Sequence, residues 1–433
     1  MNPYEQLDEK AFWALAVARA GGATTDGIWK PKFGITPTTR VVTYGSCFAQ
    51  HIGRSLAERG YRWLNTEPAP PGLSAENARK YNYGIFSGRT GNIYTVSLLL
   101  QWVRWALGDA TPPDEIWEQD GRFHDPFRPR IEPGGFASRE ELEGSRAMAL
   151  EAFRLALSKA GVMVFTLGLT ESWFHRQAGH EYPMCPGTAA GTFDPQLHGF
   201  VNQDYPFIRQ SLVEAIARIR AHNRKMRFLL TVSPVPLTAT MSGQHVVVAT
   251  TESKSILRAV AGSVAREHAY VDYFPSYEII TAPAFGASFF EANQRTVTRA
   301  GVDRVMRAFF AAMDGEAAAG GEAPRAAAVP PGEAEDWSAK RRSGRVRRRV
   351  PCRKAGWRVK LCIRVTATPA ACAAGGTGRR RTRGASIGLL RLARQWPGRT
   401  GGRRRRAGPG HGQGGARYRV HQRRVAGRAA GRL

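Results

Sequence analysis

The chain has 433 residues, of which 63 are Lys or Arg and 35 are Asp or Glu, so its formal net charge is +28. The whole excess lies at the C-terminus, because the stretch from Arg341 to Leu433 holds 28 of the basic residues and no acidic residue. The first 340 residues are electrically balanced, which excludes a generally basic, nucleic-acid-binding character for that part of the chain.

Short apolar strands alternate with helices along the first 313 residues. Residues 1–40 are expected to form an irregular lead-in, and residues 176–205 are expected to form a long loop. Continuously apolar strands that alternate with helices are typical of a parallel sheet covered on both faces, so the sequence predicts an α/β fold. In chain order the predicted elements are strand 40–45, helices 49–60, 96–108 and 138–161, strand 162–169, helix 205–223, strand 227–236, helix 251–268, strand 269–275 and helix 299–313.

Composition separates a domain at residues 1–318 from an Arg-, Gly- and Ala-rich tail at residues 319–433. Such a tail cannot bury enough apolar surface to offset chain entropy, so we expect it to be disordered. Two other interpretations stay open. The tail could bind nucleic acid through phosphate contacts, or it could be an out-of-frame translation of a GC-rich gene, which would remove nucleic acid as a partner.

The remaining composition points to a cytoplasmic protein. Its five cysteines form no disulfide framework, its N-terminus is too polar for a signal peptide, and no apolar run is long enough to span a membrane. No phosphate-binding loop, dinucleotide glycine pattern or metal-ligand spacing occurs, so we expect no cofactor, no metal and no membrane partner.

The first predicted strand leads into a turn with two candidate nucleophiles. It ends in Gly45, Ser46 and Cys47, and a predicted helix follows. A thiol at a helix N-terminus lies at the positive end of the helix dipole, which favours the thiolate. We therefore expect Cys47 to be a nucleophile with a lowered pKa. Ser46 is the alternative nucleophile, and a buried, inert Cys47 is the structural alternative.

Several unusual words occur in a consistent order along residues 30–312: "YGSCFA", "RTGNIYT", "TLGLTESW", "CPGTAAGTFDP", "TVSPVPLTAT" and "YFPSYEI". Together they resemble the GSCFA family, which is similar to the SGNH hydrolase superfamily. Members of that superfamily are esterases and acyl-transfer enzymes. The resemblance implies a three-layer, flavodoxin-like parallel sheet.

The resemblance also implies roles for residues near the strand ends. Alignment on Gly45 puts Cys47 at the position of the superfamily's catalytic serine, and Gly45 itself in the substrate-binding turn. Gly91 and Asn92 resemble its glycine-loop element. Thr170 and Glu171 occupy the positions of the last two residues of its Gly-x-Asn-Asp motif, so Thr170 or Asn92 is expected to hold the oxyanion and Glu171 to take part in catalysis.

The expected base is missing from its usual place. The superfamily carries Asp-x-x-His before its last helix, and here Asn293 and Thr296 stand at those positions. Neither can accept a proton at neutral pH. Glu278 is expected to orient a histidine or bind substrate. The candidate bases are His245, after the third strand, then His198 in the long loop, and then His180 and His51.

The sequence thus predicts a cofactor-independent hydrolase or acyltransferase that acts on ester bonds, with its nucleophile at the "GSC" turn. By analogy alone, its substrate is a small-molecule or acylated-glycan ester. The alternative is a catalytically inactive SGNH-like binding module, which the missing Asp-x-x-His pair favours.

Overall fold

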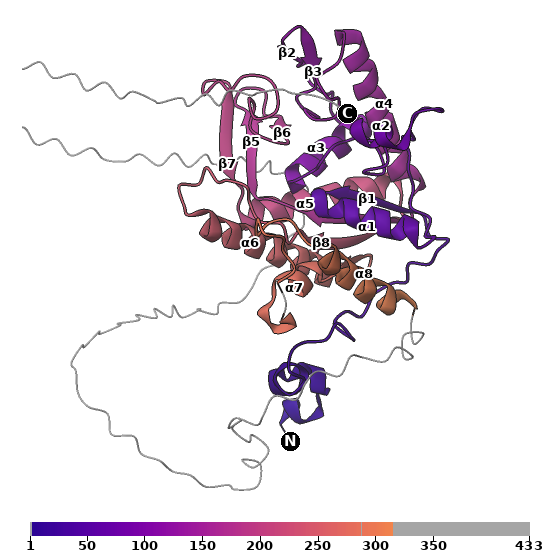
Figure 1. Cartoon of the computed structure of the whole chain (residues 1–433), viewed down its shortest axis with the longest axis vertical. Coiled ribbons are helices and arrows are strands. Elements are labelled where there is room, and N and C mark those ends of the chain that lie inside the picture. The colour runs from indigo at the N-terminus through magenta and orange to yellow at the C-terminus, as the bar shows by residue number, and fades with distance from the viewer. Residues whose placement is uncertain (1, 287, 315–433) are drawn as a thin grey trace, which may run out of the picture. The chain divides into compact units, whose positions relative to one another are not determined.

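A four-stranded parallel sheet forms the centre of the fold (Figure 1). The computed structural model describes residues 2–286 and 288–314. The predicted α/β fold with a parallel sheet is confirmed, whereas the predicted basic tail at 319–433 lies outside the described residues. In spatial order the strands are β1 (Val41–Gly45), β4 (Val162–Leu167), β8 (Arg227–Val232) and β9 (Val271–Tyr273).

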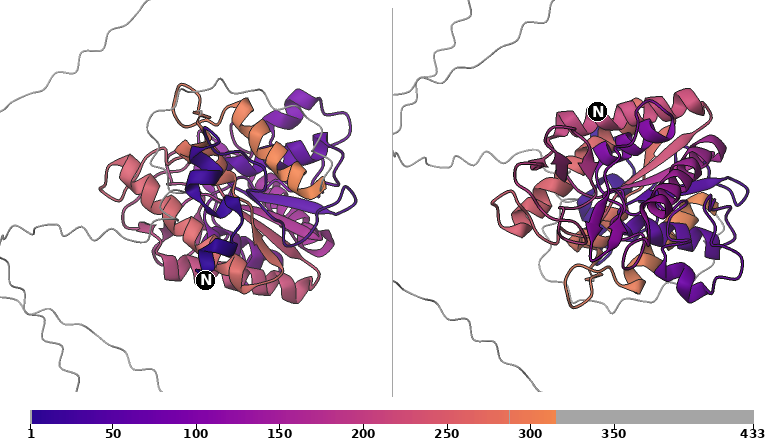
Figure 2. Two further views of the ribbon diagram at one scale, coloured as in Figure 1. Left: turned by 90° about the horizontal axis from the view of Figure 1, so that it is seen from below. Right: turned by 90° about the horizontal axis from the view of Figure 1, so that it is seen from above.

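Side chains alternate between the two faces of this sheet, and helices cover both faces (Figure 2). Met163 and Leu230 belong to one apolar core, and Val164 and Leu229 belong to the other. The first core is closed by α3 (Val96–Ala106), α4 (Arg139–Lys159), α5 (Tyr205–His222) and α6 (Val246–Glu267). The second is closed by α1 (Cys47–Glu58), α7 (Ser276–Thr281) and α8 (Arg299–Asp314). The fold is therefore three-layered.

A single bridge extends the sheet beyond β1. Trp63 pairs with Val41 in parallel, on the side of β1 that β4 does not occupy. With this bridge counted as the second strand in sequence, the spatial order becomes 2-1-3-4-5, which is the flavodoxin-like order. From β1 the chain first continues to the Trp63 side of the sheet and then returns to β4 on the other side of β1. Open α/β sheets bind ligands where the strand order reverses in this way.

Residues 171–202 differ from the sequence prediction, which placed a long loop at 176–205. They form an antiparallel sheet of β5 (Glu171–His175), β6 (Glu181–Tyr182) and β7 (His198–Asn202), in the order β6-β5-β7. These strands are short and β5 and β7 are partly exposed, so they lack the continuous apolar run that marked the central strands. Gln101 on α3 hydrogen-bonds to the backbone of Glu181 and ties this sheet to the first helical layer.

The remaining elements are short. Helix α2 (Ala75–Lys80) and the hairpin of β2 (Trp117–Gln119) and β3 (Arg122–His124) lie between β1 and α4 in the chain. The predicted irregular lead-in contains the helical turns η1 (Pro3–Gln6), η2 (Glu9–Ala11) and η3 (Ala14–Ala18), and η4 (Pro283–Phe285) follows α7. Among the described helices, none combines the length and apolar character that a membrane crossing requires.

Candidate active site

The turn from β1 into α1 depends on a glycine. Gly45 has a φ of 129°, and a Cβ at this position would lie 2.3 Å from the carbonyl oxygen of Thr166 on β4. That close approach lets the amide of Ser46 donate to the same oxygen over 3.1 Å. Helix α1 then begins at Cys47, so the thiol stands at the carboxyl end of β1.

A cavity of about 350 Å³ opens at this end of the sheet. Residues that follow β1, β4 and β8 line it, and so do residues of the antiparallel sheet and of the segment before α8. The cavity thus lies where the crossover direction reverses. Its lining includes Ser46, Cys47, Tyr94, Arg130, Gly168, Glu171, Glu181 and Arg295.

Burial and the nearby charges shift the pKa of the Cys47 thiol in opposite directions. Burial raises the pKa of Cys47, and this effect outweighs the charges of Arg295 and Lys254 and the backbone amides of Cys47 and Phe48, which all lower it. The predicted lowering of this pKa is therefore wrong. The helix N-terminus acts as expected, but the half-buried thiol loses more hydration than the dipole replaces.

Lys254 is the residue that the sequence prediction missed. It lies on α6, is 1% exposed, and its ammonium donates a 2.7 Å hydrogen bond to the carbonyl oxygen of Gly168. Burial lowers the pKa of Lys254 to about 7; the Cys47 thiol acts against this shift and Arg295 adds to it. A signal existed in the sequence, because Lys254 is spaced three and seven residues before the buried Leu257 and Ala261 on one helix face.

Ser46, the alternative nucleophile, also lines the cavity. Its side chain is 2% exposed, and its hydroxyl has no hydrogen-bond partner among the described residues. A Cβ on Gly168 would lie 3.0 Å from the Cβ of Ser46, so the ends of β1 and β4 are in close contact here.

None of the residues expected to hold the oxyanion lines this cavity: Thr170 is buried outside it, and Gly91 and Asn92 lie in a neighbouring cavity. Thr170 is fully buried, donates its hydroxyl to Asn202 over 2.6 Å and does not line the cavity. Gly91 and Asn92 line an adjoining cavity, which shares Tyr94 and Arg130 with the first one. The side chain of Gln50 donates to the Asn92 oxygen, and the Asn92 amide hydrogens have no acceptor among the residues that the structure describes.

Glu171 lines the cavity, as expected of a residue at a strand end. Its carboxylate accepts hydrogen bonds from the hydroxyl of Thr240 and the amide of Met241. Glu278, in contrast, lies outside the cavity, where it pairs with Arg258 and accepts a 2.8 Å bond from the hydroxyl of Tyr273.

The expected histidine bases do not line the cavity either. His245 is exposed at the N-terminus of α6, where its ring accepts a bond from the amide of Val247. His198 is buried on β7 and accepts from the amide of Asp194, and burial lowers its pKa. The other two candidates, His180 and His51, also lie outside the lining of this cavity.

The segment that replaces Asp-x-x-His forms a closed turn. Asn293 accepts from the amides of Arg295 and Thr296, and its own amide donates to the Thr296 hydroxyl over 2.9 Å. This turn directs Arg295 into the cavity, where its Nε donates to the carbonyl oxygen of Pro236. In the part of the chain that the structure describes, no three His, Cys, Asp or Glu side chains are grouped so that they could hold a metal ion.

Comparison with known proteins assigns the family. No curated protein and no solved structure matches the chain. The sequence profile of the GSCFA family matches residues 40–309, which is more than half of the chain and includes every residue that lines the cavity at the Cys47 turn. The chain therefore belongs to the GSCFA family.

Proposed function

We propose that the protein is a cofactor-independent acyl hydrolase or acyltransferase that acts on ester bonds, with Cys47 as the nucleophile and Lys254 as the base. One observation carries this proposal. A thiol at a helix N-terminus lines the cavity, and a buried amine lies behind that lining on the Gly168 carbonyl, close enough for the charge of each to shift the pKa of the other. Such a pairing of a nucleophile with an adjacent base is the requirement for covalent catalysis.

The first step forms a thioester. The neutral amine of Lys254 takes the proton of the Cys47 thiol as the sulfur attacks the ester carbonyl. The carbon–oxygen bond of the ester then breaks, and the leaving alkoxide takes the same proton back from the Lys254 ammonium. The products of this half-reaction are a free alcohol and an acyl group on Cys47.

The second step releases the acyl group. A water molecule, or the hydroxyl of an acceptor, gives a proton to Lys254 and attacks the thioester carbonyl. The sulfur leaves as a thiolate and recovers its proton from Lys254. A base whose pKa lies near 7 suits both directions of this transfer at neutral pH.

Donors for the oxyanion are available at the same turn. The amides of Cys47 and Phe48 point toward the thiol and belong to the first turn of α1, which has no earlier carbonyl to bond to. The amide hydrogens of Asn92 lie in the adjoining cavity. Two or three such donors are typical of sites that stabilise a tetrahedral intermediate.

The test is hydrolysis of p-nitrophenyl acetate by the full chain. We expect Cys47→Ala and Lys254→Met to reduce turnover to the background rate, and Ser46→Ala to retain it. Turnover that survives in Cys47→Ala but not in Ser46→Ala would reassign the nucleophile to Ser46. Near-ultraviolet circular dichroism of each variant serves as the control for correct folding.

The binding module is the second candidate function, and the raised pKa of Cys47 favours it. A thiol that stays protonated at neutral pH is a poor nucleophile unless a base assists it. If the wild-type protein is folded but turns over neither p-nitrophenyl acetate nor acetylated glycans, the binding module replaces the hydrolase.

A further inference from the structure

The wall of the cavity carries two guanidinium groups without an acidic partner. Arg130 and Arg295 both line it, and neither forms an ion pair with any described residue. Two arginines of the adjoining cavity do have acidic partners. Arg89 pairs with Glu67 and Glu132, and Arg128 pairs with Asp125.

Only one nitrogen of the Arg295 guanidinium forms a hydrogen bond with a described residue. Its Nε donates to the carbonyl oxygen of Pro236 over 3.1 Å, and its backbone is fixed by the Asn293 turn. The two terminal nitrogens have no acceptor among residues 2–286 and 288–314. The geometry therefore leaves free the edge of the guanidinium that binds carboxylate and phosphate oxygens.

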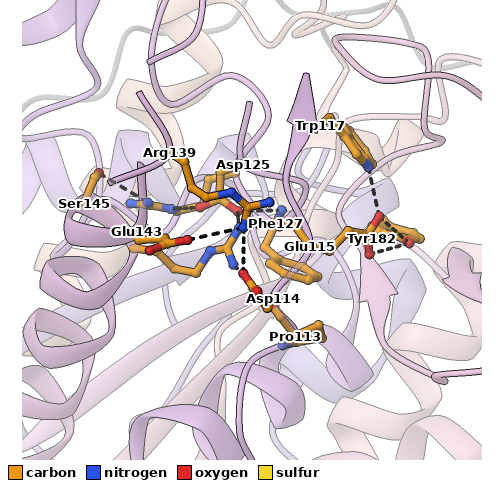
Figure 3. A network of polar contacts seen from close by, with 12 residues as sticks. Pro113, Asp114, Glu115, Trp117, Asp125, Phe127, Arg139, Glu143, Ser145 and Tyr182 are labelled. Carbon is orange, nitrogen blue, oxygen red and sulfur yellow. Dashed lines mark hydrogen bonds and ion pairs between the residues drawn. The ribbon is translucent and has the colours of Figure 1, made fainter. Parts of the chain in front are cut away.

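Arg130 is exposed at the rim, but its backbone is held firmly. The side chain of Asn82 donates to the carbonyl oxygen of Arg130 over 3.0 Å. The residues just before it are fixed by a buried network around Asp125, which is labelled in Figure 3; Asp125 accepts from Arg128 over 2.7 Å and from Arg146 over 3.0 Å. Arg128 also donates to Ser145. The start of the Arg130 side chain is thus set before any ligand arrives.

Tyr94 shows that these groups converge. Burial raises the pKa of Tyr94, the Cys47 charge raises it further, and the charges of Arg130 and Arg295 both lower it. One phenol therefore lies within electrostatic reach of the thiol and of both guanidinium groups. The same cavity wall thus holds the nucleophile and two positive charges.

The acidic residues of the cavity do not neutralise these charges by pairing. Glu171 is bonded to Thr240 and to the amide of Met241, which are neutral donors. Glu181 is buried, accepts from the hydroxyls of Thr95 and Ser97, and has a pKa that burial raises. Both of these partners of Glu181 are neutral hydroxyls.

We infer that the substrate of this cavity carries an anionic oxoacid group, a carboxylate or a phosphate, which Arg130 and Arg295 bind beside Cys47. The inference rests on the proposed function for the chemistry of the substrate, but the anion site itself does not depend on turnover. Bidentate binding by arginine in a partly desolvated cavity is a strong and geometrically specific way to hold such a group.

The first experiment compares alkylation of Cys47 by iodoacetate and by iodoacetamide, measured on the Cys47 peptide by mass spectrometry. Both reagents react with the thiolate, so the ratio of the two rates cancels the pKa of the thiol. We expect the iodoacetate-to-iodoacetamide ratio to exceed that of glutathione by about tenfold or more. Arg130→Gln and Arg295→Gln should each reduce it.

The control is Arg224→Gln. Arg224 is exposed in the loop between α5 and β8, at the amino-terminal end of the parallel strands, whereas the cavity lies at their carboxyl ends; its loss changes the net charge by the same amount. Its ratio should equal that of the wild type. A wild-type ratio equal to that of glutathione, or an equal decrease in all three variants, would overturn the inference.

Thermal unfolding in millimolar succinate or phosphate provides a second measurement that needs no reactive thiol. We expect one of the two anions to raise the Tm of the wild type and of Arg224→Gln, but not of the Arg130→Gln/Arg295→Gln double variant. Stabilisation by succinate assigns a carboxylate, and stabilisation by phosphate assigns a phosphate. No difference between the wild type and the double variant would contradict an anion site.

Hydrolysis separates this inference from the proposed function. With a charged ester, mono-p-nitrophenyl succinate, Arg295→Gln should lower kcat/KM more than it does with p-nitrophenyl acetate. Anion binding without hydrolysis of either ester would leave the anion site standing and remove the proposed chemistry. Hydrolysis with the same loss on both esters would leave the chemistry standing and remove the anion site.

Discussion

Lys254 donates a 2.7 Å hydrogen bond to the carbonyl oxygen of Gly168, and Gly168 is in close contact with Ser46, the residue before Cys47. The amine and the thiol reach this point from opposite faces of the sheet, on α6 and α1. The carboxyl ends of β1 and β4 are where the two layers bring these groups together.

The pH dependence of activity distinguishes a lysine base from a free thiolate. With Lys254 as base, kcat/KM should rise with pH through about 7, where the amine becomes neutral. A rise above pH 9 instead would indicate a thiolate that forms without help, because the pKa of Cys47 is raised from 9.0. Lys254→Met and Lys254→Arg should both lower kcat by about 10²- to 10⁴-fold.

The same lysine should affect stability. Its pKa is about 7 when folded and about 10.4 when unfolded. Between these values the unfolded state binds the extra proton, so the free energy of unfolding gains a positive slope of up to about 1.4 kcal/mol per pH unit. Urea denaturation at pH 7, 8 and 9 should give a smaller slope in Lys254→Met than in the wild type. The exposed Lys225→Met variant should keep the wild-type slope, and an unchanged slope in Lys254→Met would contradict this assignment.

Gly45→Ala should disrupt the turn that carries Cys47. The added Cβ would lie 2.3 Å from the Thr166 carbonyl oxygen, at a φ of 129°. We expect urea denaturation to show a loss of more than about 3 kcal/mol. Gly60→Ala is the matched control, since Gly60 also has a positive φ but has nothing within 4 Å, and should cost about 1 kcal/mol. Equal losses in the two variants would show that the contact with β4 does not matter.

Asp125→Ala should leave Arg128 and Arg146 buried without their partner (Figure 3). The expected loss in the free energy of unfolding is about 3–5 kcal/mol. Glu151→Ala, which removes an exposed pair with Arg154, should cost less than about 1 kcal/mol. Although burial alone raises the pKa of Asp125, the two arginines hold it below its ordinary value. The contribution of Asp125 should therefore be complete above about pH 4 and be lost as the pH falls further.

The central sheet was predictable because its strands are continuously apolar and are followed by short polar segments. That pattern follows directly from burial on both faces. The antiparallel sheet at 171–202 was missed because its short strands are stabilised by Gln101 and by one another rather than by an apolar pattern. Local sequence carries little trace of such contacts.

The candidate site was predicted only in part. Local chemistry indicated Cys47, the family resemblance indicated Glu171, and both line the cavity. The sequence indicated histidines as the base, whereas a titratable amine near Cys47 belongs to a lysine that is distant in sequence and buried on a helix. Its low pKa arises from burial, which depends on the assembled fold and not on neighbours in the chain.

The two faces of the sheet also set an order of events during synthesis. Cys47 on α1 and Lys254 on α6 are separated by 207 residues of sequence. A ribosome that adds 5 to 20 residues per second needs roughly 10 to 40 s to make that stretch. Throughout this interval the nascent chain carries a thiol without its amine, so the chemistry we propose begins only after β4, β8 and α6 have joined the fold.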